Sequence, residues 1–226
     1  MVGAGKSAAT MARAVEHAWP DVALSDIVVT RYGHSVPTER IQVREAAHPV
    51  PDKAGQEATA DILKTVGTAD EGDLVLALIS GGGSALLTAP VPTLTFDDKI
   101  DVTRRLLASG LPVAEMDHLR RWLSLVKGGG LARVAAPARL VTLATSDVPG
   151  DDSMAIASGS TVPCLMTISI SRAPLNGLGR ACPTRYCLRS PSGRNGTTLL
   201  RLSTTDFWTR RRCRWMLQRR WRSGTG

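Results

Sequence analysis

A run of three glycines between two serines is the segment of the chain best suited to bind an anion. It consists of Ser80, Gly81, Gly82, Gly83 and Ser84, and it follows an apolar stretch that is expected to be a buried strand. Consecutive glycines let backbone N–H groups approach phosphate oxygens without interference from a Cβ atom, and a helix that begins there adds further N–H groups. We therefore expect a phosphate-binding loop, the alternative being a flexible turn that binds nothing.

A lysine occupies a comparable place near the N-terminus. Lys6 follows Gly3-Ala4-Gly5 and stands at the start of an alanine-rich helical segment. A positive charge on the first turn opposes the helix dipole, so we favour an active-site cation over a purely structural residue. The segment lacks the earlier glycine of a P-loop. It matches the GxGxxA fingerprint of dinucleotide-binding sheets only weakly, because just two residues precede it, even though Asp26 supplies the expected acid.

Three aspartates and two cations complete the set of candidate site residues. Asp147, Asp151 and Asp152 follow a predicted strand. They could hold Mg²⁺, which binds carboxylate ligands, or form a solvated turn that caps a helix. Arg120 and Lys127 lie seven residues apart, so they share one helix face if the helix continues that far. Together they could clamp a carboxylate or a phosphate, although a solvated basic face is equally compatible with the spacing.

These loops lie between segments that alternate between strand and helix patterns. Strands are expected at 26–30, 41–46, 74–79 and 140–144, and helices at 7–18, 54–66, 96–109, 113–125 and from 131. The strands are continuous apolar runs, which is typical of a parallel sheet buried on both faces. The fold class is therefore α/β, a layered Rossmann-like domain with a mostly parallel sheet. Ligands bind such sheets at the C-terminal ends of the strands, where the candidate loops stand.

The composition changes at residue 163. The 226 residues carry a net charge of +8, but residues 164–226 alone account for +12, with 13 Arg, no Lys and one acid. The first 163 residues carry −4, so we expect a mildly acidic N-terminal α/β domain over 1–163 and an irregular Arg-rich tail over 164–226. Because only two residues precede the first glycine turn, the first strand is expected to be incomplete and the domain truncated at its start.

Three interpretations of the Arg-rich tail are open. It contains all four cysteines, at spacings that match no common zinc pattern, and three of the five tryptophans. Arg could contact phosphates and Trp could stack on bases, as in a nucleic-acid-binding tail. The segment could instead be a solvated disordered tail. The abrupt change, with Arg in place of every Lys, favours out-of-frame translation, so no nucleic-acid binding is expected from it.

Six segments together resemble the glycerate 2-kinase family, the group with the so-called MOFRL C-terminal domain. They are VGAGKSAATMARAVE (2–16), RYGHSVP (31–37), EAAHPVPDKAGQEAT (45–59), LISGGGSALLTAP (78–90), LRRWLSLVKGGGLA (119–132) and LATSDVPGDDSMAIASGSTVP (143–163). They occur in the order of the family and cover nearly all of residues 2–163. Members of this family have often been labelled hydroxypyruvate reductases in tartrate-utilisation gene clusters.

The resemblance implies transfer of the γ-phosphoryl group of ATP, with Mg²⁺, to the 2-hydroxyl of D-glycerate. Phosphoryl transfer depends on positioning and charge neutralisation, which suits the residue types at the loops. By position in the family motifs, Lys6 and Arg120 are the expected catalytic residues, Ser80 to Ser84 and Lys127 bind the nucleotide, and Asp147, Asp151 and Asp152 hold the metal.

The chain also departs from the family pattern. The long-helix motif usually reads INTVRKHLS, whereas residues 116–124 read MDHLRRWLS, and Gly130 and Ser160 replace the usual residues of two other motifs. The family's active site lies in a cleft between two domains, and no segment after residue 163 resembles the second domain. The resemblance therefore implies that this chain could lack part of the site and be inactive.

A second enzyme class remains open, namely an NAD(P)H-dependent hydroxypyruvate reductase. Kinase and reductase would both act on a three-carbon acid, glycerate or hydroxypyruvate, so basic residues in a cleft suit either. A reductase needs a nicotinamide site and a proton donor, for which His48 is the only loop candidate. In either case we expect a cytoplasmic enzyme with a small-molecule substrate and no membrane span, and a homodimer is compatible with the sequence.

Overall fold

The structure, a computed structural model, describes residues 1–24, 26–162 and 198–202. Its strands form one parallel sheet in the order β3-β2-β1-β4-β5-β6. The strands are β1 (Val2–Ala4), β2 (Asp26–Arg31), β3 (Ile41–Ala46), β4 (Leu74–Ser80), β5 (Arg139–Thr145) and β6 (Thr198–Leu202). This is the strand order of a doubly wound Rossmann sheet, so the predicted α/β fold with a mostly parallel sheet is confirmed.

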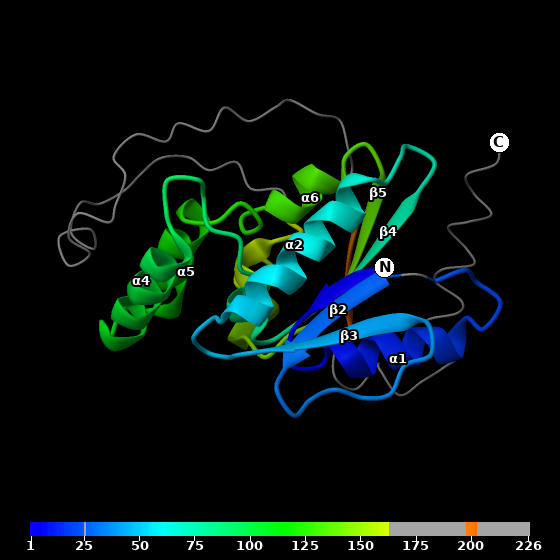
Figure 1. Cartoon of the computed structure of the whole chain (residues 1–226), viewed down its shortest axis with the longest axis horizontal. Coiled ribbons are helices and arrows are strands. Elements are labelled where there is room, and N and C mark those ends of the chain that lie inside the picture. The colour runs from blue at the N-terminus through cyan, green and yellow to red at the C-terminus, as the bar shows by residue number, and fades with distance from the viewer. Residues whose placement is uncertain (25, 163–197, 203–226) are drawn as a thin grey trace.

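Helices cover both faces of the sheet. They are α1 (Ala8–Ala18), α2 (Lys53–Gly67), α3 (Gly83–Leu86), α4 (Phe96–Ala108), α5 (Val113–Trp122) and α6 (Gly130–Ala135), followed by the 3-10 turns η1 (Pro149–Asp151) and η2 (Ile156–Gly159). Figure 1 shows α2 and α6 on one side of the sheet and α1 on the other. Asp52 begins α2, because its side chain accepts the N–H of Gly55 at 2.9 Å.

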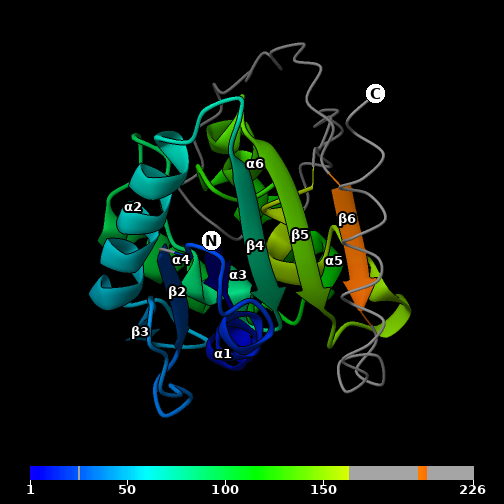
Figure 2. The same ribbon diagram turned by 90° about the vertical axis from the view of Figure 1, so that its right-hand side faces the viewer.

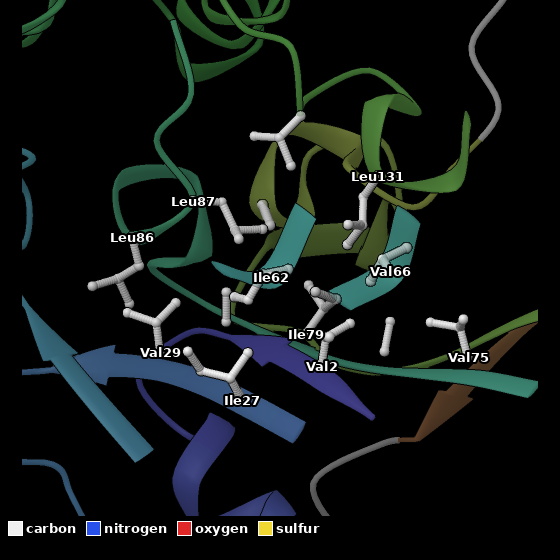
Figure 3. Packing of buried hydrophobic residues seen from close by; sticks show 14 of the residues in the cluster. Val2, Ile27, Val29, Ile62, Val66, Val75, Ile79, Leu86, Leu87 and Leu131 are labelled. Carbon is white, nitrogen blue, oxygen red and sulfur yellow. The ribbon is translucent and has the colours of Figure 1, made fainter. Parts of the chain in front are cut away.

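Successive residues of each strand point to opposite faces, and this alternation builds two cores. Ile27 and Val29 pack toward α2 and α6, whereas Val28 between them packs toward α1. Figure 3 shows the larger core, where Ile62 and Val66 of α2 lie over the strands. Because apolar side chains are needed on both faces, the strand sequences are continuous rather than alternating.

A third apolar cluster joins α4 to α5 and contains no sheet residue. Figure 1 shows these two helices as a pair set apart from the sheet. Their cluster comprises Val91, Leu94, Val102, Leu106, Leu119 and Leu123. A capping box between Thr95 and Asp98 fixes the start of α4. The pair therefore forms one wall beside the sheet, supported by its own core.

Residues 198–202 pair with β5 as the edge strand β6, within the segment expected to be an irregular tail. Figure 2 shows β4, β5 and β6 side by side, with their arrowheads at the same end. The rest of that segment, with its cysteines and tryptophans, lies outside the described residues. Within the described part of the chain, no helix is long and apolar enough to cross a membrane.

The strand order places three loops at one edge of the sheet. β1 and β4 pair with each other at the middle of the sheet. From β1 the strands continue to one edge through β2 and β3, and from β4 they continue to the other edge through β5 and β6. Such a switch point leaves a crevice at the C-terminal ends of the strands, where ligands bind. The loops after β1, β4 and β5 begin at Gly5, Gly81 and Ser146, so the segments singled out from the sequence meet there.

Candidate functional site

The loop after β4 presents a row of backbone N–H groups. Among the described residues, the N–H groups of Gly81, Gly82, Gly83 and Ser84 donate no hydrogen bond. Gly82 has a φ of 83°, which only glycine adopts without strain, and it turns the chain from β4 into α3. Consecutive N–H groups in such a turn form a concave site for an anion. The geometry agrees with the loop predicted to bind phosphate.

Glycine is also required here because neighbouring segments come very close. A Cβ atom on Gly81 would overlap the carboxylate of Asp147, and one on Gly83 would lie 2.9 Å from the Cβ of Ala157. A Cβ on Gly82 would lie 3.1 Å from Cδ2 of His48. The loop is therefore packed against the segments that follow β3 and β5, and larger residues would displace them.

The loop after β1 is built differently. The N–H groups of Gly5, Lys6, Ser7 and Ala8 all donate to acceptors of the protein. These acceptors are the carbonyls of Val29, Gly81 and Gly5 and the hydroxyl of Ser80, at 2.8–3.1 Å. Four occupied N–H groups cannot bind a pyrophosphate, so this turn supports the β4 loop and leaves the Lys6 side chain partly exposed beside it.

Lys6 and Asp147 meet across the glycine loop. Lys6 Nζ lies 3.4 Å from Asp147 Oδ2, and the two side chains are 38% and 54% exposed. An ion pair this exposed contributes little to stability, about 0–1 kcal/mol. Lys6 therefore lies beside the loop, and a phosphate group could replace Asp147 as its partner at little cost.

A pocket of about 280 Å³ opens beside the loop. It is lined by Gly81, Gly82, Ser84 and Asp147 from the sheet edge, and by residues of α4 and α5. Arg120 and Lys127 both line it, so the structure brings together the two cations predicted from the sequence. They do not share one helix face, however, because α5 ends at Trp122 and Lys127 follows in a loop.

Lys127 is fully buried, and its ammonium group is already engaged. Lys127 Nζ donates to the carbonyl oxygen of Leu87 at 2.7 Å. Burial lowers the pKa of Lys127 well below its ordinary value of 10.5, and the nearby Lys99 and Arg120 lower it further, whereas Asp117 acts in the opposite direction. Lys127 therefore ties the loop after α5 to the end of α3, as well as lining the pocket.

A chain of hydrogen bonds links the glycine loop to Arg120. Ser84 Oγ lies 2.5 Å from Ser158 Oγ, which donates to Asp117 Oδ1 at 2.9 Å. Arg120 Nη1 lies 3.2 Å from the same carboxylate oxygen. Because the Ser158 hydrogen is directed at Asp117, Ser84 must donate to Ser158. The Ser84 hydroxyl is thus used within the protein, and its contribution to anion binding is its backbone N–H.

The turn η2 holds this chain in place with an unusual backbone. Ala157 and Ser158 have φ values of 48° and 54°, in the left-handed region that costs energy for residues other than glycine. The carbonyl of Ser158 accepts the Gly128 N–H at 3.0 Å and Arg121 Nε at 3.3 Å. These bonds keep η2 against α5 and the loop that follows it.

The three aspartates predicted to hold a metal are not gathered into one site. Asp147 lines the pocket, whereas Asp151 and Asp152 are exposed and do not. Asp152 Oδ1 accepts the Met154 N–H at 2.9 Å, which closes a local turn. No group of three His, Cys, Asp or Glu that could hold a metal occurs in the described part of the chain. A magnesium site shared by all three aspartates is therefore not formed, and Asp147 alone of the three stands where a metal beside bound phosphates could contact it, so this role stays a prediction.

Sequence reasoning missed Lys99, Asp117 and Ser158. Lys99 is 2% exposed and Asp117 is 2% exposed, and both line the pocket. Lys99 shares a helix stripe with Val102 and Leu106, at spacings of three and seven residues, which was the available signal that it is buried. No sequence pattern indicates that Ser158 bridges α3 and α5, because those contacts depend on the left-handed turn.

His48 lies at the rim of the pocket, next to Gly82. Burial lowers the pKa of its imidazole below the ordinary 6.5, and the charges of Lys6 and Arg31 lower it further. The side chain is therefore neutral at pH 7. A neutral imidazole can accept a proton but is a poor donor, which disfavours the donor role that a reductase would need.

Curated proteins and a family model match this chain. A protein of Agrobacterium vitis named "Putative hydroxypyruvate reductase" is 53% identical over 183 residues, which are 81% of this chain and 42% of that protein. A protein of Thermotoga maritima named "D-glycerate 2-kinase" is 40% identical over 164 residues, 72% of this chain and 39% of its own length. The chain spans about two-fifths of the length of these relatives.

Comparison with solved structures gives the same relationship. A crystal structure of glycerate kinase from Thermotoga maritima superposes with a TM-score of 0.71 at 32% identity, over 89% of this chain and 50% of that one. The family model matches residues 1–179 and so runs past residue 163. The boundary expected there from composition stays a prediction. The chain belongs to the family described as "Domain of unknown function (DUF4147)", and its resemblance to glycerate 2-kinases is confirmed.

Proposed function

We propose that the protein to which this chain belongs transfers the γ-phosphoryl group of ATP to the 2-hydroxyl of D-glycerate. The observation that carries the proposal is the row of N–H groups at Gly81 to Ser84, none of which donates to a residue that the structure describes, with Lys6 beside it at the switch point of the sheet. Relatives named glycerate 2-kinase share this part of the sequence at 40% identity. Positioned donors and a cation are what phosphoryl transfer requires of a protein.

Each group has a specific task in this proposal. The N–H groups of Gly81 to Ser84 hold phosphate oxygens. Lys6 gives up its ion pair with Asp147 and instead stabilises the negative charge that develops on the transferred phosphoryl group. The P–O bond to ADP breaks while a bond forms to the 2-hydroxyl oxygen, whose proton must leave. His48 is neutral and lies at the pocket rim, so it can accept that proton. Arg120 lines the pocket that would receive the acceptor.

The reductase alternative has weaker support from the geometry. Dinucleotide-binding sheets hold the pyrophosphate on N–H groups of the turn after β1. In this chain the N–H groups of Gly5 to Ala8 are already bonded within the protein. The turn after β1 therefore has no free N–H groups, among the described residues, for the nicotinamide dinucleotide that a hydroxypyruvate reductase would use.

Titration calorimetry with ATP and with NADH separates the two functions. The chain should bind ATP, and Gly81→Ala should weaken that binding at least tenfold, because the new Cβ displaces Asp147 and narrows the loop. Gly72→Ala is the matched control, since a Cβ at Gly72 meets no atom within 4 Å. An assay of ADP release with D-glycerate then tests the reaction. Binding of NADH but not ATP would refute the proposal.

A further inference from the structure

Lys99 is a buried lysine whose ammonium group has no partner among the described residues. It lies on the inner face of α4, is 2% exposed and lines the pocket beside the glycine loop. Its backbone N–H and carbonyl bond to Thr95 and Thr103, but its ammonium group makes no hydrogen bond or ion pair with any residue that the structure describes. An isolated buried ammonium group is strongly unfavourable unless something compensates its charge. Its position is therefore unexplained by the fold alone.

The neighbouring groups cannot supply that compensation. The Asp117 carboxylate is shared between Arg120 and Ser158. Asp147, the other acid that lines the pocket, pairs with Lys6 at its outer edge. Lys127 is a further buried basic residue of the pocket, and burial followed by the charge of Lys99 lowers its pKa well below 10.5. The pocket is thus lined by three basic residues, on α4, on α5 and in the following loop, and by two acids that are both already paired, so neither acid is left for Lys99.

The pocket limits what kind of anion could compensate Lys99. Its volume of about 280 Å³ lies just below the range of roughly 300–1,000 Å³ that is usual for ligand sites, so it suits a small molecule. Leu107, Val113 and Met116 form an apolar wall of the pocket. Gly81 and Gly82 of the glycine loop line another part of it. A small organic acid could place its carboxylate at Lys99 and its remaining atoms toward the loop.

We propose that Lys99 is the residue that recognises the carboxylate of the acceptor, in the pocket between α4, α5 and the glycine loop. The proposal rests on the proposed function for the identity of the acceptor as D-glycerate. The charge and size of the pocket support the remaining part of the proposal, which is that its ligand is a small carboxylate. Arg120 lines the same pocket from α5. Because it is already paired with Asp117, it does not take over the role of Lys99 in binding the carboxylate.

The test is titration calorimetry of the full 226-residue chain at pH 7 without nucleotide. The probes are D-glycerate, hydroxypyruvate and lactate, with glycerol as the ligand that lacks a carboxylate. We expect the carboxylates to bind and glycerol not to bind. Lys99→Met should weaken carboxylate binding roughly 10- to 100-fold, the range for losing a hydrogen bond to a charged group. Lys64→Met, an exposed lysine of α2, should leave binding unchanged.

A second measurement detects the charge of Lys99 itself. Burial, and then Arg120, lowers the pKa of Lys99 to about 8, so a bound carboxylate should draw a proton onto it at pH 8.5. Binding enthalpies in two buffers of different ionisation enthalpy report that uptake. The other groups facing the pocket are Arg120, Lys127, Asp117, Asp147 and His48. We expect proton uptake in the wild-type chain and in Lys64→Met, and none in Lys99→Met.

The outcomes separate this proposal from the proposed function. Carboxylate binding that depends on Lys99 supports the pocket assignment even if ATP does not bind, because no nucleotide is present in the titration. Failure of all three carboxylates to bind the wild-type chain would overturn it. Binding by Lys99→Met as tight as wild type would also overturn it, and would show that Lys99 is compensated by another part of the protein.

Discussion

Replacing Lys99 with methionine should stabilise the folded chain at neutral pH, although it removes a charged residue from a helix. Burial, and then the charge of Arg120, lowers the pKa of this ammonium from 10.5 to about 8. At about 1.4 kcal/mol per pKa unit, that difference corresponds to a destabilisation of about 3 kcal/mol. Methionine has a similar length and no charge, so it should fill the site and remove this penalty.

The sign of the pH dependence follows from the direction of the shift. The folded chain binds the Lys99 proton more weakly than the unfolded chain does. The penalty is therefore complete below about pH 8 and disappears as the pH rises past 10.5. The advantage of Lys99→Met in the free energy of unfolding should be about 3 kcal/mol at pH 7 and should shrink steadily between those two values.

Urea unfolding followed by circular dichroism measures this advantage at each pH. The exposed Lys64→Met is the matched control and should change the free energy of unfolding by less than about 0.5 kcal/mol at every pH. If Lys99→Met is less stable than the wild-type chain at pH 7, or if its advantage does not depend on pH, then Lys99 is not the uncompensated cation inferred from its burial.

Two further substitutions test the supports of the site. Gly5→Ala should destabilise the chain by about 3 kcal/mol, because Gly5 has a φ of 136° and the new Cβ would lie 2.5 Å from the carbonyl oxygen of Ser80; Gly72→Ala is its control. Although burial raises the pKa of Glu16, hydrogen bonds from three backbone N–H groups lower it more, to below 4.5. Glu16→Ala should therefore cost at least about 2 kcal/mol at pH 7, and this loss should diminish as the pH falls below 4.5, both measured by urea unfolding.

The order of the elements and the position of the site could be predicted from the sequence. The apolar run 74–79 followed by three glycines leaves little choice but a buried strand that enters a tight loop. Because strands of a parallel sheet end at the same edge, the loops carrying Lys6, Gly81 and Asp147 had to lie on one side of the molecule. Their direct contact depends on the strand order, which periodicity does not specify.

The pocket could be predicted only in part. Arg120 and Lys127 reach the same pocket, but through a loop rather than one helix face. Asp151 is exposed and does not line the pocket, because the chain turns at η1 after β5, and a sequence pattern does not reveal such a turn. The stripe that Lys99 shares with Val102 and Leu106 indicates its burial, but its place at the pocket depends on the packing of α4 on α5, which the local sequence does not specify.

The proposed function depends on the N–H groups of Gly81 to Ser84, which would hold the phosphates of a nucleotide. Amide resonances of the isotopically labelled chain, followed by NMR during titration with ATP and with NADH, test it most directly. We expect ATP to shift the amide resonances of residues 81–84 most, and those of Gly5 and Ala8 least, because these two N–H groups already donate to the carbonyls of Val29 and Gly5. Shifts at residues 5–8 caused by NADH, with residues 81–84 unaffected by ATP, would contradict it.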